Sequence, residues 1–241
     1  MKLSLIVPVY NEFNTAATLL DKLLALEIPG VAKEIVIVES RSTDGTTDVV
    51  RKYEKRPGVR VIYEDKPRGK GAAVRTGLAY VTGDVVAIQD ADLEYDVAEY
   101  PRLLEPIRKE QADVVLGSRV LTSHWQFRRF GGLERLYGFV VNLGGVIYTG
   151  LFNLLYGTRI SDGATMFKIY RAHLLEGLQL RSDVFDYDWE MLAKCAKRGD
   201  VRFVDMPVSY TARSRAQGKK IRFWRDGWRV FVAIVKYRFV D

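Results

Sequence analysis

The first 120 residues alternate between short apolar runs and longer stretches in which apolar residues recur every three or four positions. The first pattern predicts buried strands and the second predicts amphipathic helices. The predicted strands cover residues 3–9, 34–39, 59–63, 85–89 and 113–117, and the predicted helices cover residues 14–26, 45–56, 71–81 and 97–109. This βαβα order predicts an α/β fold with a mostly parallel sheet flanked by helices.

The pattern changes in the second half of the chain. Residues 133–156 are apolar, which predicts one or two helices broken near Gly144 and Gly150. Beyond them the pattern predicts a turn and strand over 160–170, a helix over 189–198, an edge strand with Pro207 over 201–210, and a basic amphipathic helix over 219–239. No Pro/Gly/Ser-rich linker separates the halves, so we expect one domain over residues 1–241.

Composition narrows the class of protein. With Cys195 as its one cysteine the chain has no disulfide framework, and its N-terminus does not resemble a signal peptide, so a cytoplasmic location is the default expectation. No apolar run reaches the roughly 18 uninterrupted residues of a membrane span. The net charge of +7 suits phosphorylated substrates, nucleic acid or an anionic membrane. Nucleic-acid binding is disfavoured because the basic residues are spread along the chain.

Three carboxylates alternate where the predicted strand 85–89 ends, at Asp90, Asp92 and Glu94. Unpaired carboxylates near a core are unfavourable. A hard cation such as Mg²⁺ or Mn²⁺ prefers oxygen ligands and leaves coordination positions for a phosphate. The run therefore predicts a metal that holds a diphosphate. The alternative is a helix start followed by a solvated acidic turn.

Other polar residues also follow predicted strands. Asn11, Glu39 and Ser40 fall at strand ends, and parallel sheets bind ligands at the carboxyl ends of their strands. We therefore expect these residues on the same rim as Asp90. The segment Arg-Gly-Lys-Gly at 68–71 begins a predicted helix, where backbone N–H groups and a cation suit a phosphate. A solvated basic loop is the alternative.

Seven segments together resemble family 2 glycosyltransferases of the GT-A fold, in the branch of dolichyl-phosphate mannose and glucose synthases. They are IVPVYNE at 6–12, VESRSTDGT at 38–46, RGKGAA at 68–73, DAD at 90–92, GSR at 117–119, SDGATMFKIYR at 161–171 and FDYDWE at 185–190. The chain departs from the family at Glu39-Ser40, where many members have two aspartates, and shows none of the membrane-spanning helices that many members carry. The resemblance implies a Rossmann-like GT-A domain with a donor half (1–120), an acceptor-side half (121–218) and a basic tail (219–241).

The resemblance also implies roles for individual residues. It places Asp90, Asp92 and Glu94 on Mg²⁺ or Mn²⁺, although Glu94 is equally explained as a solvated helix-start acid. The residues that it implies for the nucleotide-sugar donor are Pro8, Tyr10, Glu12, Glu39, Lys70, Asp90, Arg215 and Lys219. The last two belong to a basic segment similar to a loop that closes over the diphosphate in related enzymes, unless it is simply solvated.

Asp92, Arg119 and Asp188 are the predicted catalytic residues. Arg119 offers a planar guanidinium to a phosphate, with a surface ion pair as the alternative. Asp188 would be the general base if the acceptor were a sugar hydroxyl, and a helix N-cap otherwise. Asp162 is carried over from the family as a residue that shapes the site.

The function implied is inverting, metal-dependent transfer of a hexose from GDP-mannose or UDP-glucose to a polyprenyl or dolichyl phosphate at the cytoplasmic membrane face. The apolar residues 136–155, preceded by Arg128, Arg129 and Arg135, suit a lipid phosphate, but core packing explains the apolar stretch equally well. The basic tail with its tryptophans is typical of a helix in a membrane interface, or of a helix docked on the core. The alternative function keeps the donor chemistry and transfers to a soluble sugar or glycoside, with Asp188 as base.

Overall fold

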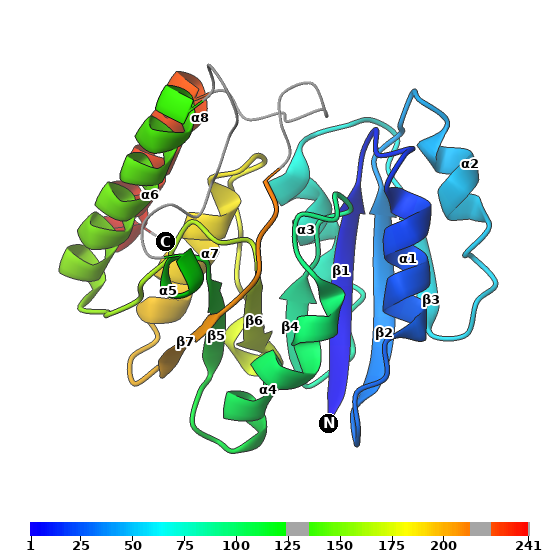
Figure 1. The fold of residues 1–241 in the computed structure, drawn as a ribbon, viewed down its shortest axis with the longest axis horizontal. Helices are drawn as coiled ribbons and strands as arrows, with labels where there is room; N and C mark the ends of the chain where they lie inside the picture. The colour runs from blue at the N-terminus through cyan, green and yellow to red at the C-terminus, as the bar shows by residue number, and fades with distance from the viewer. Residues whose placement is uncertain (124–134, 213–222, 241) are drawn as a thin grey trace.

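The computed structural model describes residues 1–123, 135–212 and 223–240. Its centre is a seven-stranded sheet in the order β3-β2-β1-β4-β6-β5-β7 (Figure 1). The strands are β1 (Lys2–Val9), β2 (Ala32–Glu39), β3 (Val59–Tyr63), β4 (Val85–Ile88), β5 (Val114–Ser118), β6 (Lys168–Arg171) and β7 (Phe203–Pro207). All neighbouring strands are parallel except β6, which is antiparallel to β4 and β5. The predicted mixed, mostly parallel α/β sheet is confirmed.

Helices cover both faces of this sheet (Figure 1). They are α1 (Ala16–Ala25), α2 (Thr46–Arg51), α3 (Lys70–Leu78), α4 (Tyr100–Arg108) after the 3-10 turn η1 (Val97–Glu99), α5 (Val120–Ser123), α6 (Arg135–Tyr156), the 3-10 turn η3 (Ala172–Leu174), α7 (Tyr187–Ala196) and α8 (Phe223–Phe239). Helices α6 and α8 lie side by side at the β7 end of the sheet, and α8 also packs on α7 (Figure 1).

The apolar strands contribute to two hydrophobic cores because successive side chains of a strand point to opposite faces. In β1, Leu5 and Val7 pack into the core beneath α1 and α4, while Ile6 packs into the core beneath α3 and α7. All three side chains are fully buried. Burial on both faces explains why these strands read as continuous apolar runs rather than alternating ones.

The predicted elements agree with the structure except in one region. The helix break expected near Gly144 and Gly150 is wrong, because α6 is continuous from Arg135 to Tyr156. A glycine weakens a helix by only about 1 kcal/mol relative to alanine, and packing against α8 and α7 stabilises this one. The predicted edge strand is confirmed, with Pro207 as the last residue of β7 at the sheet edge.

Helices α6 and α8 each expose a stripe of large apolar side chains. The stripes, together called the α6–α8 surface below, comprise Phe139, Val140, Leu143, Val146, Ile147 and Leu154 on α6 and Trp228, Phe231, Val232 and Phe239 on α8. Part of α6, Gly138–Tyr156, is long and apolar enough to cross a membrane, and 28% of its most apolar window is buried. The segment contains no long uninterrupted apolar run, because glycine and polar residues occur within it.

Candidate active site

A cavity of about 650 Å³ opens beyond the carboxyl ends of the parallel strands. Its walls come from the segments after β1, β2, β4 and β5, from the first turns of α3 and α7, and from α6 and α8. The predicted site residues among them are Pro8, Tyr10, Glu12, Lys70, Asp90, Asp92, Glu94, Arg119 and Asp188. The fold therefore brings together residues from both halves of the chain.

The segment after β1 is held by hydrogen bonds to the segment after β2. Asn11 adopts a left-handed backbone conformation with φ of 50°, and its side chain accepts from the Thr43 N–H at 2.8 Å. The Glu12 N–H donates to Thr46 Oγ1 at 3.0 Å. Asp44 accepts from the N–H groups of Phe13 and Thr46, so it links the segment after β1 to the start of α2, whose N-cap residue is Gly45. These contacts hold Tyr10 and Glu12 at the cavity wall.

Glu39 was expected to contact the donor but does not line the cavity, and Asn11 and Asp162 do not line it either. Its side chain is 1% exposed and accepts from the backbone N–H groups of Arg41 at 3.1 Å and Ser42 at 2.7 Å. The carboxylate therefore shapes the turn after β2, and the neighbouring Ser40 lines the cavity instead. Ser40 donates to Glu64 at 2.8 Å. The sequence analysis assigned the donor contact to Glu39 because Glu39 and Ser40 occupy the positions at which many family members have two aspartates.

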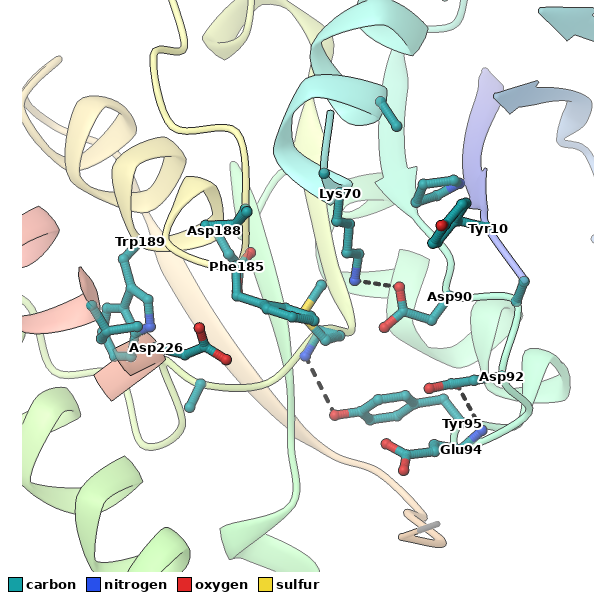
Figure 2. A pocket seen from close by; sticks show the side chains of 18 of the residues that line it. Tyr10, Lys70, Asp90, Asp92, Glu94, Tyr95, Phe185, Asp188, Trp189 and Asp226 are labelled. Atoms are coloured by element: carbon teal, nitrogen blue, oxygen red, sulfur yellow. Dashed lines mark hydrogen bonds and ion pairs between the residues drawn. The ribbon is translucent and has the colours of Figure 1, made fainter. Parts of the chain in front are cut away.

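Lys70 enters the cavity from the first turn of α3. Gly69 precedes it with φ of 117°, a conformation that favours glycine. The Lys70 ammonium forms an ion pair with Asp90 (Figure 2) and lies 5.9 Å from the centre of the Tyr187 ring. The structure therefore brings the basic segment at 68–71 next to the acidic run at 90–94.

The acidic run turns sharply after β4. Leu93 has φ of 60°, and the Glu94 N–H donates to Asp92 Oδ1 at 3.1 Å. The Tyr210 hydroxyl donates to Glu94 at 2.8 Å. Asp90, Asp92 and Glu94 all line the cavity, but the described residues contain no group of three acidic, histidine or cysteine side chains close enough to hold a metal by themselves. A metal here would need oxygen atoms from a ligand.

Arg119 follows β5 and forms a buried ion pair with Asp162. Arg119 Nε lies 2.7 Å from one carboxylate oxygen and a terminal nitrogen lies 2.8 Å from the other, and both side chains are 2% exposed. Burial by itself would lower the pKa of Arg119, but the Asp162 charge raises that pKa overall, so the guanidinium stays charged. The guanidinium lies over the Tyr210 ring at 5.2 Å. The pair is not the surface ion pair considered from the sequence, and Asp162 positions Arg119 at the cavity wall.

Asp188 lies in the first turn of α7 and does not form its N-cap, which is Asp186. Its carboxylate is paired with the ammonium of Lys168, and both side chains are buried. Burial raises the pKa of Asp188, while the Lys168 charge opposes that rise. Sequence reasoning did not anticipate Lys168, whose position in β6 resembles that of an ordinary strand residue.

The far end of the cavity lies between α6 and α8 and is largely apolar. Val141 and Tyr148 of α6 and Val230 of α8 line it, together with Gly144 and Gly145. Asp226 of α8 adds one buried carboxylate, which Figure 2 shows on the Trp189 side of the cavity, and Arg225, which also lines this end, lies 3.5 Å from it. Sequence reasoning missed Asp226 because its place among exposed cations suggested a solvated helix face.

The model of the family described as "Glycosyl transferase family 2" matches residues 4–178. The chain belongs to glycosyltransferase family 2. It is 30% identical over 223 residues to the dolichol-phosphate mannosyltransferase of Pyrococcus furiosus, covering 91% of this chain and 59% of the relative. It is 25% identical over 222 residues to the dodecaprenyl-phosphate galacturonate synthase of Rhizobium johnstonii, covering 91% and 62%. The chain thus spans only about three fifths of these two relatives.

One shorter relative is matched over most of its length. The undecaprenyl-phosphate mannosyltransferase of Micrococcus luteus is 26% identical over 230 residues, covering 91% of this chain and 87% of the relative. Among solved structures, glucosyl-3-phosphoglycerate synthase from Mycobacterium tuberculosis, in complex with Mn²⁺, UDP and phosphoglyceric acid, superposes with a TM-score of 0.71 at 19% identity. The superposition covers 100% of this chain and 79% of that one. It shows that this family 2 chain shares that enzyme's fold.

Several sequence-based assignments lie outside the described residues of this family 2 chain. Arg215 and Lys219, assigned to the donor, fall within 213–222, and Arg128 and Arg129 fall within 124–134. The Arg135 side chain is likewise not described. The roles of these five residues stay predictions.

Proposed function

We propose that this chain transfers a hexose from a nucleoside-diphosphate sugar to a polyprenyl phosphate, with inversion at the sugar. The observation that carries the proposal is a single cavity with a charged end and an apolar end. Lys70, Asp90, Asp92 and Arg119 lie at the charged end, and α6 and α8 enclose the apolar end. A charged donor and a lipid-linked phosphate need these two surroundings. Named relatives act on dolichol, dodecaprenyl or undecaprenyl phosphates, which supports this acceptor class.

The donor is GDP-mannose or UDP-glucose in this proposal. The cavity wall supplies Pro8, Tyr10, Glu12 and Ser40 on one side and the start of α3 on the other, which suits a nucleotide with its diphosphate directed at Lys70. The mannosyltransferases among the relatives favour a mannose donor, and the structural neighbours crystallised with UDP favour a uridine donor. Measured turnover with each donor decides between them.

The residues present fit a divalent cation of the Mg²⁺ or Mn²⁺ type. Asp90 and Asp92 supply hard oxygen ligands at the cavity wall, and a donor diphosphate supplies the remainder. Glu94, which accepts a hydrogen bond from Tyr210, would be a further ligand of the metal or would lie next to its ligands. Bound there, the metal neutralises negative charge that develops on the leaving diphosphate. Solved neighbours of the same fold contain Mn²⁺ or Mg²⁺ with UDP, which supports this assignment.

In the transfer step itself, side chains of the protein position the phosphate groups and stabilise their negative charge. A phosphate oxygen of the acceptor forms a bond to the anomeric carbon as the bond from that carbon to the diphosphate breaks on the opposite side, which inverts the centre. Lys70 stabilises the leaving diphosphate, and Arg119, held by Asp162, orients a phosphate. The apolar walls exclude water and so limit hydrolysis of the donor.

A phosphate acceptor needs no general base, because it is already an anion at neutral pH. The ion pair between Asp188 and Lys168 agrees with this, since Lys168 occupies the carboxylate that would otherwise take a proton. The second candidate is transfer to a soluble sugar or glycoside with Asp188 as base. Two observations favour this soluble acceptor. Asp188 lies at the cavity wall, and structural neighbours bind phosphoglyceric acid, which is a soluble molecule.

The experiment measures nucleoside diphosphate release from GDP-mannose and UDP-glucose with Mg²⁺ or Mn²⁺, with and without a short polyprenyl phosphate. Release that depends on the lipid is the expected result. Asp188→Asn then retains most turnover with the lipid phosphate, because no proton is removed. Release that ignores the lipid, together with a loss of turnover in Asp188→Asn, would favour the soluble acceptor instead.

The proposed acceptor implies a place for the protein at a membrane surface. The α6–α8 surface exposes large apolar side chains, with Trp228 65% and Ile147 56% exposed. On α8 the exposed cations Arg229 and Lys236 lie beside the apolar stripe, and the buried Ala233 and Tyr237 lie on the opposite side of the helix. Aromatic residues beside cations suit the interface of an anionic bilayer. We place this surface on the cytoplasmic face of the membrane.

A further inference from the structure

Lys70 and Asp90 form an ion pair that is largely shielded from solvent, with side chains 13% and 19% exposed. Lys70 Nζ is itself buried, and the Asp90 carboxylate is its one ion-pair partner in the part of the chain that the structure describes. An ammonium carries three N–H donors, and one carboxylate oxygen cannot satisfy all of them. Buried donors without acceptors are unfavourable. The ammonium is therefore suited to a ligand that brings further oxygen atoms.

The backbone of Lys70 is fixed by close packing on both sides. A Cβ atom on Gly69 would lie 2.3 Å from the carbonyl oxygen of Asp183, and one on Gly71 would lie 2.4 Å from that of Ser182. The Ala72 N–H donates to the Asp183 carbonyl at 3.2 Å. Movement at this position is therefore confined to the long lysine side chain, which has four rotatable bonds.

Asp90 has two competing partners in the proposed function. The Lys70 ammonium pairs with it in the ligand-free protein, and the divalent cation needs the same carboxylate. A dication beside an ammonium in a shielded site is repelled strongly. A metal that arrives alone must therefore displace Lys70 from its acceptor and offers it no replacement.

We propose that Lys70 is the counter-ion of Asp90 in the nucleotide-free protein, and that it moves to the diphosphate when metal and nucleotide bind together. The inference rests on the proposed function, because it takes Asp90 as a metal ligand. The diphosphate oxygens satisfy the ammonium, and the metal then takes its place at Asp90. Metal and nucleotide therefore bind cooperatively, and by linkage each increases the affinity for the other. When the nucleoside diphosphate leaves, Lys70 returns to Asp90 and favours release of the metal.

The test measures Mn²⁺ binding by the loss of the free Mn²⁺ signal in electron paramagnetic resonance, with and without GDP or UDP. The variants are Lys70→Met, which removes the charge, and Lys70→Gln, which removes the charge but keeps N–H donors. Lys66→Met is the matched control, because Lys66 is exposed, lies four residues earlier and does not line the cavity. Samples of nucleotide without protein correct for Mn²⁺ bound in solution, and thermal melts verify that each variant folds.

We expect weak Mn²⁺ binding to wild type and Lys66→Met without nucleotide, and much tighter binding with it. Both Lys70 variants should bind Mn²⁺ without nucleotide about tenfold more tightly than wild type, and should lose most of the gain on adding nucleotide. Unchanged or weaker Mn²⁺ binding by the folded Lys70 variants, with normal nucleotide-dependent binding in wild type, would overturn this inference alone. Absence of Mn²⁺ binding in every protein even with nucleotide would overturn the metal assignment of the proposed function as well.

Discussion

Two cavity carboxylates, Asp92 and Asp188, differ in their surroundings and therefore in what they can do. Asp188 is buried and paired with Lys168, so its charge is compensated within the protein. Asp92 accepts a hydrogen bond from the Glu94 N–H on a partly exposed turn at the cavity wall. A carboxylate at such a turn can bind a cation that arrives with a ligand, whereas a buried paired carboxylate mainly positions its neighbours.

At the residue scale, we expect Asp92→Ala to reduce turnover by about a hundredfold or more, because charge on the leaving diphosphate is no longer neutralised. The melting temperature should change little, since the side chain is not in the core. Nucleoside diphosphate release and a thermal melt give the two readouts. Asp96→Asn, which removes a carboxylate that caps η1 and does not line the cavity, is the control. Equal turnover in both variants would contradict the metal assignment of Asp92.

At the scale of elements, the first turn of α3 packs directly on the segment that leads into α7. Gly71 has no room for a side chain there, because a Cβ atom would lie 2.4 Å from the Ser182 carbonyl oxygen. Glu190 of α7 holds the same segment by accepting from the backbone N–H groups of Arg181 and Ser182. The first turn of α3, which carries Lys70, and the segment before α7, the helix that carries Asp188, are therefore held together by close packing.

Gly71→Ala should destabilise the protein by about 1–3 kcal/mol and weaken nucleotide binding, because the start of α3 must move away from Ser182. Gly150→Ala is the matched control in α6, where nothing lies within 4 Å of the added Cβ. That control should stabilise the protein by roughly 0.5–1 kcal/mol through helix propensity. Denaturant unfolding and nucleotide titration measure both effects, and equal stability of the two variants would contradict the packing argument.

A second element-scale prediction concerns the edge strand β7. Hydrogen bonds from Arg202 hold the pKa of Asp113 low, at about 2. A carboxyl whose pKa is lower in the folded than in the unfolded protein stabilises the fold above its unfolded pKa of about 4, and this contribution is lost as the pH falls through about 2. Asp113→Asn should therefore lower the melting temperature by roughly 2–4 °C at pH 7. Thermal melts at pH 7 and at pH 2 test this, and the difference from wild type should shrink at the lower pH.

At the scale of the whole molecule, the cavity and the α6–α8 surface share the same two helices. Helix α6 lines the cavity with Val141 and Tyr148 while it exposes Leu143 and Ile147. A lipid phosphate held in the cavity could therefore extend its chain along α6 toward a bilayer. Membrane binding through the α6–α8 surface would therefore bring the cavity close to its lipid acceptor.

The membrane placement predicts vesicle binding that depends on both apolar and anionic contacts. Trp228→Glu should reduce partitioning onto phosphatidylglycerol-containing vesicles by about tenfold, because the variant loses a large apolar side chain that would enter the bilayer and adds a charge that the anionic lipids repel. Tyr80→Glu is the control, since Tyr80 is 39% exposed but lies outside the α6–α8 surface. Cosedimentation at low and high salt measures the effect. Equal partitioning of the two variants would contradict the placement.

The sequence alone predicted the α/β fold and the edge of the sheet at which the cavity lies. Apolar runs buried on both faces predicted the parallel strands of the first 120 residues. Of the four residues expected together at the strand ends, Ser40 and Asp90 line the cavity, whereas Asn11 and Glu39 do not. These features depend on local periodicity and on the general rule that parallel strands present their carboxyl ends to ligands. A local sequence pattern is enough to locate the strands and to predict where they end.

Only the tertiary structure decided which charges are compensated and by which partners. Lys168 pairs with Asp188 and Asp162 with Arg119 across long sequence separations, and Glu39 turns to its own backbone. The continuity of α6 and the burial of Asp226 likewise depend on packing between α6, α7 and α8. Ion pairing and burial depend on distances in space, which periodicity along the chain does not encode.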